Sequence, residues 1–233
     1  KALRGRAGRM RNGRGSGRAS KGAVRLWGRH AVEAALKNPE RTHRKLWATR
    51  EGVESLDGEL PPDFPVEWAD VQDLARLVAR DAPHQGLVLE CEPLPDMFLA
   101  DVLDGDPARV LVVLDQVTDP HNVGAILRSA EVFGARAVIA PRHHSAPETG
   151  ALAKTASGAL ERQPYLRVRN LGDAMETLDR LGYQLVGLDG EGEAVLEDAV
   201  AETAGRPLGL VLGAEGPGLR PRTRALCHVL ARI

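Results

Sequence analysis

Short apolar runs alternate with amphipathic helical patterns through the second half of the chain. The runs of strand length lie at 110–114, 137–140, 165–168, 183–188, 208–212 and 229–233. Between them, apolar positions recur at helical spacing at 123–133, 148–158, 171–181 and 221–227. Uninterrupted apolar runs are typical of strands covered on both faces, and alternation of strand and helix indicates a parallel sheet. The pattern therefore predicts an α/β fold with a doubly wound parallel sheet.

A smaller α/β module is predicted before this sheet. Residues 27–38 carry apolar positions at helical spacing up to Asn38-Pro39, and 71–79 indicates a second helix. The segments 45–49, 65–69 and 86–91 have strand patterns, and prolines, acids and a glycine mark 94–108 as a linker. The predicted domains are thus a basic tail at 1–22, a small module at 23–93, the linker, and the parallel-sheet domain at 109–233.

Basic residues are concentrated at the amino-terminal end. Residues 1–22 contain eight Lys or Arg, six Gly and no Asp or Glu, so the remaining chain holds 23 basic and 32 acidic side chains. A Gly/Arg-rich segment cannot bury a core, so we expect this tail to be disordered when free. Its cations could displace counterions from RNA phosphates, which gives salt-dependent affinity without sequence preference. A solvated tail with no binding role would have the same composition.

The composition argues against several classes of protein. Phe, Trp and Tyr make up 3% of the chain, so stacking platforms for unpaired bases are scarce. Cys91 and Cys227 lack the spacing of a disulfide framework or a zinc site, and the adjacent His143 and His144 lack supporting ligands. No apolar run approaches the ~20 residues of a membrane span. We therefore expect a soluble, cytoplasmic protein without a metal or a membrane contact.

The first candidate site follows the strand at 110–114. Residues 115–121 form a polar turn, and a helix with Arg128 on its polar side begins after them. Open α/β sheets bind ligands outside the carboxyl ends of their strands, so a polar turn at this place is a candidate site. Asn122 has the position of a helix N-cap, and Arg128 could either pair with Glu131 or face a ligand.

Two more loops follow predicted strands. The sequence GAEGPG at 213–218 has three glycines that let the backbone approach a ligand closely, and it carries the carboxylate of Glu215. Residues 188–190, Leu-Asp-Gly, end another strand and could line the same crevice. The spacing of the glycines matches neither the dinucleotide GxGxxG nor a Walker loop. On the residues alone, a purely structural role remains open for both loops.

Several of these motifs together resemble a known family. LDQVTDPHNVGAILRSAE at 114–131, LVLGAEGPGL at 210–219 and the terminal HVLARI resemble motifs of the SpoU (TrmH) branch of the SPOUT RNA methyltransferases. WGRHAVEAAL and APHQGLVLE resemble the RNA-binding module of bacterial 23S rRNA guanosine-2'-O-methyltransferases. The resemblance implies a homodimer, S-adenosylmethionine as methyl donor, no metal, and a deep trefoil knot at the carboxyl-terminal end. Family members continue past the position of Ile233, so the knot is expected to be incomplete in this chain.

The resemblance also implies roles for individual residues. Asn122, Arg128 and Glu215 match positions implicated in catalysis. The positions implied to bind or flank the methyl donor are Leu188, Gly190, Gly213, Gly216 and Ile233. The implied reaction is methylation of the ribose 2'-hydroxyl of a guanosine in 23S rRNA. A tRNA ribose methyltransferase and a non-catalytic RNA-binding or ribosome-assembly factor remain alternatives, and a dehydrogenase ranks last because the first strand lacks a GxGxxG turn.

Overall fold

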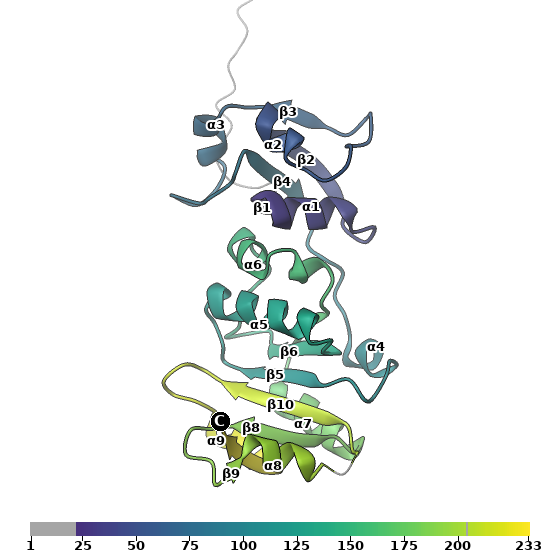
Figure 1. Cartoon of the computed structure of the whole chain (residues 1–233), viewed down its shortest axis with the longest axis vertical. Helices are drawn as coiled ribbons and strands as arrows, with labels where there is room; N and C mark the ends of the chain where they lie inside the picture. Colours follow the sequence, from purple (N-terminus) through teal and green to yellow (C-terminus); the bar gives the residue numbers. More distant parts are fainter. Residues whose placement is uncertain (1–21, 204) are drawn as a thin grey trace, which may run out of the picture.

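The computed structural model describes residues 22–203 and 205–233. The predicted tail lies outside these residues except for Gly22. The described chain forms two sheets, one of four strands and one of seven. In Figure 1 the small sheet lies at one end of an elongated molecule, and helix α6 (Gly150–Ala156) lies between it and the large sheet.

The small module has a mixed sheet in the order β1-β4-β2-β3. Its strands are β1 (Val24–Trp27), β2 (His43–Ala48), β3 (Val66–Trp68) and β4 (Leu87–Cys91). Its helices are α1 (Arg29–Lys37), α2 (Arg50–Glu54) and α3 (Val71–Ala75). The helix predicted from Trp27 begins two residues later, because Gly28 at φ 84° turns the chain between β1 and α1. Strand β1 and helix α2 were not predicted, and α3 ends before the predicted 79.

The large sheet is parallel throughout, in the order β7-β6-β5-β10-β8-β11-β9. Its strands are β5 (Leu111–Asp115), β6 (Ala137–Pro141), β7 (Tyr165–Val168), β8 (Gln184–Leu188), β9 (Ala194–Val195), β10 (Leu208–Gly213) and β11 (Val229–Arg232). This arrangement confirms the predicted α/β class. The two-residue β9 was missed because it is too short to show a pattern.

The helices of this domain connect its strands. They are α4 (Leu99–Leu103), α5 (Pro120–Val132), α6, the 3-10 helix η1 (Ala159–Glu161), α7 (Leu171–Arg180), α8 (Leu196–Ala201) and α9 (Pro221–Leu226). Helices α4 and α8 were not predicted from the sequence. Helix α4 lies within the segment expected to be a linker, and its Val102 is buried in the core of the large domain.

The predicted N-cap of helix α5 was wrong, and of the two alternatives for Arg128 the pairing with Glu131 is not found. The N-cap is Asp119, which accepts a hydrogen bond from the His121 N–H at 2.9 Å, so Asn122 lies inside the first turn. Pro120 explains the earlier start, because proline lacks an N–H and its fixed φ suits the first helical position. Glu131 pairs with Arg162 rather than with Arg128. Both differences leave the polar groups of Asn122 and Arg128 available for other contacts.

The small module packs directly on the large domain. One apolar cluster contains Leu26 and Ala35 of the module together with Leu152 and Ala156 of α6. Gly150 at the start of α6 lies under Trp27, and a Cβ at this glycine would be 1.9 Å from the indole ring. The module and the domain therefore share a continuous core at their boundary.

A buried ion-pair cluster also crosses this boundary. Arg41 of the module, whose side chain is fully buried, pairs with Glu148 and Glu161 of the large domain. Asn38 donates a second hydrogen bond to Glu161 at 2.8 Å, and Glu148 accepts one from the Leu94 N–H at 3.1 Å. Buried charges are tolerated only when they are paired and hydrogen-bonded, as these are. This group, Arg41 with Glu148 and Glu161, is called the Arg41 cluster below.

Arg41→Met should lower the free energy of unfolding by ~3–5 kcal/mol, because it leaves two largely buried carboxylates without their counter-charge. Urea denaturation followed by tryptophan fluorescence measures the change. Lys45→Met is the matched control, since its ion pair with Glu67 is exposed and contributes little. Equal stability of wild-type protein and Arg41→Met would contradict the prediction.

Candidate active site

The strand order brings the predicted site segments to one edge of the sheet. Strand β10 lies between β5 and β8, and β11 follows β8. In this register Gly213 lies beside Asp115, and Ala231 lies beside Leu188. Because all these strands are parallel, the turn after β5, the GAEGPG loop after β10 and the loop after β8 meet at their carboxyl ends.

Asp115 fixes the GAEGPG loop to the end of β5. Its side chain is fully buried and accepts hydrogen bonds from the backbone N–H and the Nε of Arg220, at 2.8 and 2.7 Å. The chain that leaves the loop is thereby held next to the turn after β5. Sequence reasoning had not singled out Asp115. The available signal was a charged residue that ends an otherwise apolar strand.

The GAEGPG loop is a tight hairpin. Ala214 and Gly218 exchange two backbone hydrogen bonds of 3.1 and 2.9 Å. A Cβ on Gly213 would lie 2.2 Å from the carbonyl carbon of Gly218, so only glycine allows this close approach. Gly216 at φ +83° is in the left-handed region that favours glycine. The hairpin holds Glu215 near its exposed tip.

The structure brings two of the three predicted catalytic residues into contact. Asn122 Nδ2 donates a hydrogen bond to Glu215 Oε2 at 3.4 Å. Arg128 lies on the same helix as Asn122, is exposed, and has no hydrogen bond or ion pair within residues 22–203 and 205–233. The site therefore combines a carboxylate, an amide that orients it, and an unpaired guanidinium further along the helix.

The predicted donor-binding residues lie on neighbouring strand ends. Leu188 lines an apolar groove of about 520 Å³ together with Leu210, Leu212 and Ile126. Gly190 and Gly216 are exposed, and a Cβ at either would meet no atom within 4 Å. Ile233 directly follows β11 and is 95% exposed. Of the five predicted positions, Leu188 alone lines the groove, whose apolar wall is compatible with the adenine of S-adenosylmethionine.

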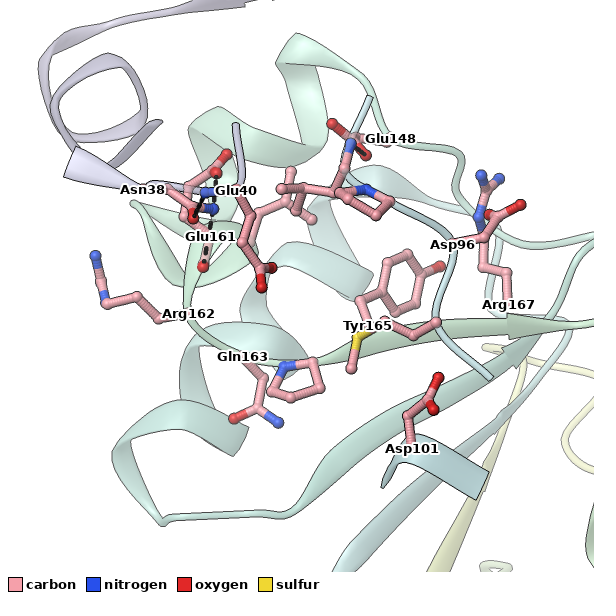
Figure 2. A pocket seen from close by; sticks show the side chains of 15 residues that line it. Asn38, Glu40, Asp96, Asp101, Glu148, Glu161, Arg162, Gln163, Tyr165 and Arg167 are labelled. Carbon is pink, nitrogen blue, oxygen red and sulfur yellow. Dashed lines mark hydrogen bonds between the residues drawn. The ribbon is translucent and has the colours of Figure 1, made fainter. Parts of the chain in front are cut away.

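A second cavity lies away from these strand ends. It has a volume of about 310 Å³ and is bordered by the module, the segment after β4 and the loop around η1. In Figure 2, Asn38 and Glu161 lie on one side of it, and Asp96 and Arg167 lie on the other. Glu40, Asp101 and Glu148 add further carboxylates to its lining. Carboxylates outnumber the two arginines of the lining, Arg162 and Arg167, so this cavity is a poor site for phosphate.

The sulfur and histidine side chains form no metal centre in the part of the chain that the structure describes. No group of three or more His, Cys, Asp or Glu there could hold an ion. Cys91 and Cys227 are free thiols, and burial raises the pKa of Cys91 to about 12 and that of Cys227 to about 11. Both are therefore unreactive at neutral pH. No helix among the described residues is long and apolar enough to cross a membrane.

Two solved methyltransferases have a similar fold. The SpoU methyltransferase AviRb from Streptomyces viridochromogenes, in complex with AdoMet, is 23% identical, with a TM-score of 0.71 over 91% of this chain and 81% of that chain. The AdoMet-bound rRNA methyltransferase from Sinorhizobium meliloti is 22% identical, with a TM-score of 0.71 over 91% and 78%. These likenesses define the fold class as that of the SpoU-type methyltransferases.

Sequence comparison is more specific. The model of the SpoU rRNA Methylase family matches residues 109–233, and the model for RNA 2'-O ribose methyltransferase substrate binding matches residues 25–97. The 23S rRNA (guanosine-2'-O-)-methyltransferases RlmB of Vibrio cholerae and Vibrio parahaemolyticus are 40% and 35% identical, each over 89% of this chain and 86% of the relative. The chain belongs to the SpoU rRNA methylase family, which confirms the resemblance found in its motifs.

Asp115→Asn should destabilise the protein by ~1.5–3 kcal/mol, because it weakens two charge-assisted hydrogen bonds to Arg220 at a fully buried position. Hydrogen exchange of the Ala214 and Gly218 amides should accelerate at the same time, since their hairpin loses its anchor. Asp70→Asn serves as the control, because asparagine keeps the capping hydrogen bond at that exposed helix start. Unchanged exchange in the hairpin would show that Asp115 does not hold the loop.

Proposed function

We propose that this protein is an S-adenosylmethionine-dependent methyltransferase that modifies the ribose 2'-hydroxyl of a guanosine in 23S rRNA. The observation that carries the proposal is the contact between Asn122 and Glu215 at the carboxyl edge of a SpoU-type sheet, with the unpaired Arg128 further along the same helix. The relatives from Vibrio cholerae and Vibrio parahaemolyticus, which match 89% of the chain, are 23S rRNA methyltransferases by name. A ribosomal RNA substrate also implies that the protein acts in the cytoplasm.

Glu215 is the proposed proton acceptor. A ribose hydroxyl is a poor nucleophile until its proton begins to leave, and a carboxylate at the loop tip can accept that proton. Asn122 orients the carboxylate through its hydrogen bond of 3.4 Å. S-adenosylmethionine supplies the electrophilic methyl group when it is bound. Alignment of the 2'-oxygen by the surrounding residues contributes much of the rate.

Arg128 is proposed to clamp the phosphate next to the target ribose. A guanidinium keeps its proton at neutral pH, so Arg128 cannot serve as the general base. Its planar donors suit a phosphate, and its charge stabilises negative charge that develops on the ribose oxygen. The absence of any carboxylate partner among the described residues leaves these donors available.

The methyl donor is proposed to bind at the ends of β8, β10 and β11. Leu188 and the adjacent apolar groove would contact the adenine, and the backbone around Gly190, Gly213 and Gly216 would approach the rest of the donor closely. Ile233, which directly follows β11, would complete this side of the site. The small module is proposed to bind the RNA substrate, which is supported by its match to the substrate-binding family model.

Arg128→Ala should lower kcat for methyl transfer at least ~100-fold, because loss of one preorganised group that stabilises developing charge costs ~10²–10³ in rate. The assay uses labelled S-adenosylmethionine and a 23S rRNA fragment. Arg180→Ala is the matched control, since Arg180 is an exposed arginine on another helix with only a local contact to Thr177. Full turnover by Arg128→Ala with RNA still bound would exclude the proposed role.

The same assay identifies the substrate when the alkali-resistant ribose is mapped. Modification of a single guanosine in 23S rRNA is the expected product. Transfer only to tRNA would favour a tRNA ribose methyltransferase instead. RNA binding without donor binding or transfer would favour a non-catalytic assembly factor.

We further propose that the protein forms a homodimer through helix α5. Val132 and Phe133 at its carboxyl-terminal end are 73% and 86% exposed, and Phe133 lines the same apolar groove as Leu188. Contiguous exposed apolar surface of this kind is typical of protein interfaces. A symmetric pairing through the carboxyl-terminal end of α5 would cover Val132 and Phe133 and place the donor groove next to the partner.

Phe133→Ser should shift the protein from dimer to monomer in light scattering coupled to size exclusion, because it removes the most exposed aromatic side chain of this surface. Phe98→Ser is the control, since Phe98 is 70% exposed but lies outside the groove. A monomeric wild-type protein at micromolar concentration would overturn the proposed dimer.

A further inference from the structure

The boundary between the module and the large domain has two edges of different charge. At one edge lies the cavity of Figure 2, where Glu40, Asp96 and Asp101 add carboxylates to the internally paired Arg41 cluster, and Arg162 and Arg167 are the only cations among the described residues that line it. At the other edge, Lys154 of helix α6 lies against Gln85 and Gly28 of the module. An RNA strand bound by both the module and the catalytic turn would cross this boundary, and the excess of carboxylates around the cavity makes that edge unfavourable for its phosphates.

Lys154 is held against the module by specific contacts. Its Nζ donates a hydrogen bond to Gln85 Oε1 at 2.5 Å, and the same oxygen accepts the Arg29 N–H at 3.1 Å. Gly28 makes room for the ammonium, because a Cβ there would lie 2.5 Å from Nζ. The position of this cation is therefore fixed by the module as well as by α6.

The ammonium of Lys154 has no carboxylate partner among the described residues. Its hydrogen-bond acceptor is the neutral amide of Gln85, whereas Arg41 at the other edge of the boundary pairs with two carboxylates. Partial burial lowers the pKa of Lys154, and no nearby anion offsets this loss of hydration. A partly desolvated cation without a counter-charge is well suited to bind an anionic ligand.

Lys154 also lies close to the catalytic turn. Helices α5 and α6 pack tightly at Gly124, where a Cβ would be 2.6 Å from Cβ of Thr155. Thr155 follows Lys154 and its Oγ1 hydrogen-bonds with His121 Nδ1 at 3.2 Å. His121 precedes Asn122 in the sequence. One short chain of contacts thus connects Gln85 of the module, Lys154, and the first turn of the catalytic helix.

We propose that Lys154 binds a phosphate of the RNA substrate where the strand crosses from the module to the catalytic turn. The proposal deepens the proposed function and rests on it for the identity of the RNA. One point charge neutralises about one phosphate, so its contribution should appear as a change in salt dependence.

The test measures binding of a fluorescently labelled 23S rRNA fragment by the full chain between ~0.05 and ~0.5 M KCl. Lys154→Gln should weaken binding ~5-fold near 0.1 M salt and reduce the log–log salt slope by ~0.7–0.9. The KM for RNA should rise in proportion, while kcat at saturating RNA and donor affinity remain unchanged. Lys154→Arg should restore the slope, because it retains the charge.

Two control variants separate phosphate binding from a structural role. Lys37→Gln removes another lysine, one that is paired with Glu33, and should leave the slope unchanged. Gln85→Ala removes the hydrogen-bond acceptor of Lys154 but retains its charge, so the salt slope of RNA binding should also stay unchanged. An unchanged slope in Lys154→Gln, or an equal loss of RNA affinity in Gln85→Ala, would overturn the proposal and make Lys154 a structural contact.

These outcomes are distinguishable from failure of the proposed function. Wild-type protein that binds the RNA fragment but transfers no methyl group would contradict the proposed methyltransferase function. The salt dependence of RNA binding by Lys154→Gln would still test the role of Lys154. Methyl transfer by Lys154→Gln with unchanged KM would overturn this inference alone. A protein that binds no fragment at any salt concentration would overturn both.

Discussion

The buried contact between Asp115 and Arg220 is the constraint on which the candidate active site depends. Strand order alone brings the ends of β5 and β10 together, but it does not fix the path of the loop that follows β10. The two hydrogen bonds to the fully buried carboxylate hold that loop beside the helix that follows β5. Without this anchor, a contact of 3.4 Å between exposed side chains such as Asn122 and Glu215 would be too weak to position a proton acceptor.

The boundary between the two domains links recognition to chemistry. Its apolar part is continuous with both cores, and the Arg41 cluster closes it with charges that are satisfied internally. The module is therefore held as part of one body with the catalytic helix pair α5 and α6. An RNA strand bound by the module would reach the site in a fixed orientation. Only a ribose at the right distance from the bound segment would then lie in the site.

The fold class was predictable because parallel strands buried on both faces leave long apolar runs, as Val113 and Leu114 illustrate. Short elements were missed, since β9 and α4 carry too few residues to show a period. The roles of the site residues came from motif resemblance, and their contact could not be predicted because Asn122 and Glu215 are 93 residues apart. Periodicity also could not reveal that Asp119 caps α5. The trefoil knot and the limits of the linker stay predictions.

The close packing of Trp27 on Gly150 limits which substrate-binding modules can be combined with this catalytic domain. Trp27 lies so close to this glycine that any side chain there would push the indole, and the module with it, off the domain. A module taken from another family member would therefore dock on this domain only if its residue at the position of Trp27 fits against Gly150. The two domains are separable in sequence, but their mating surfaces must evolve as a matched set.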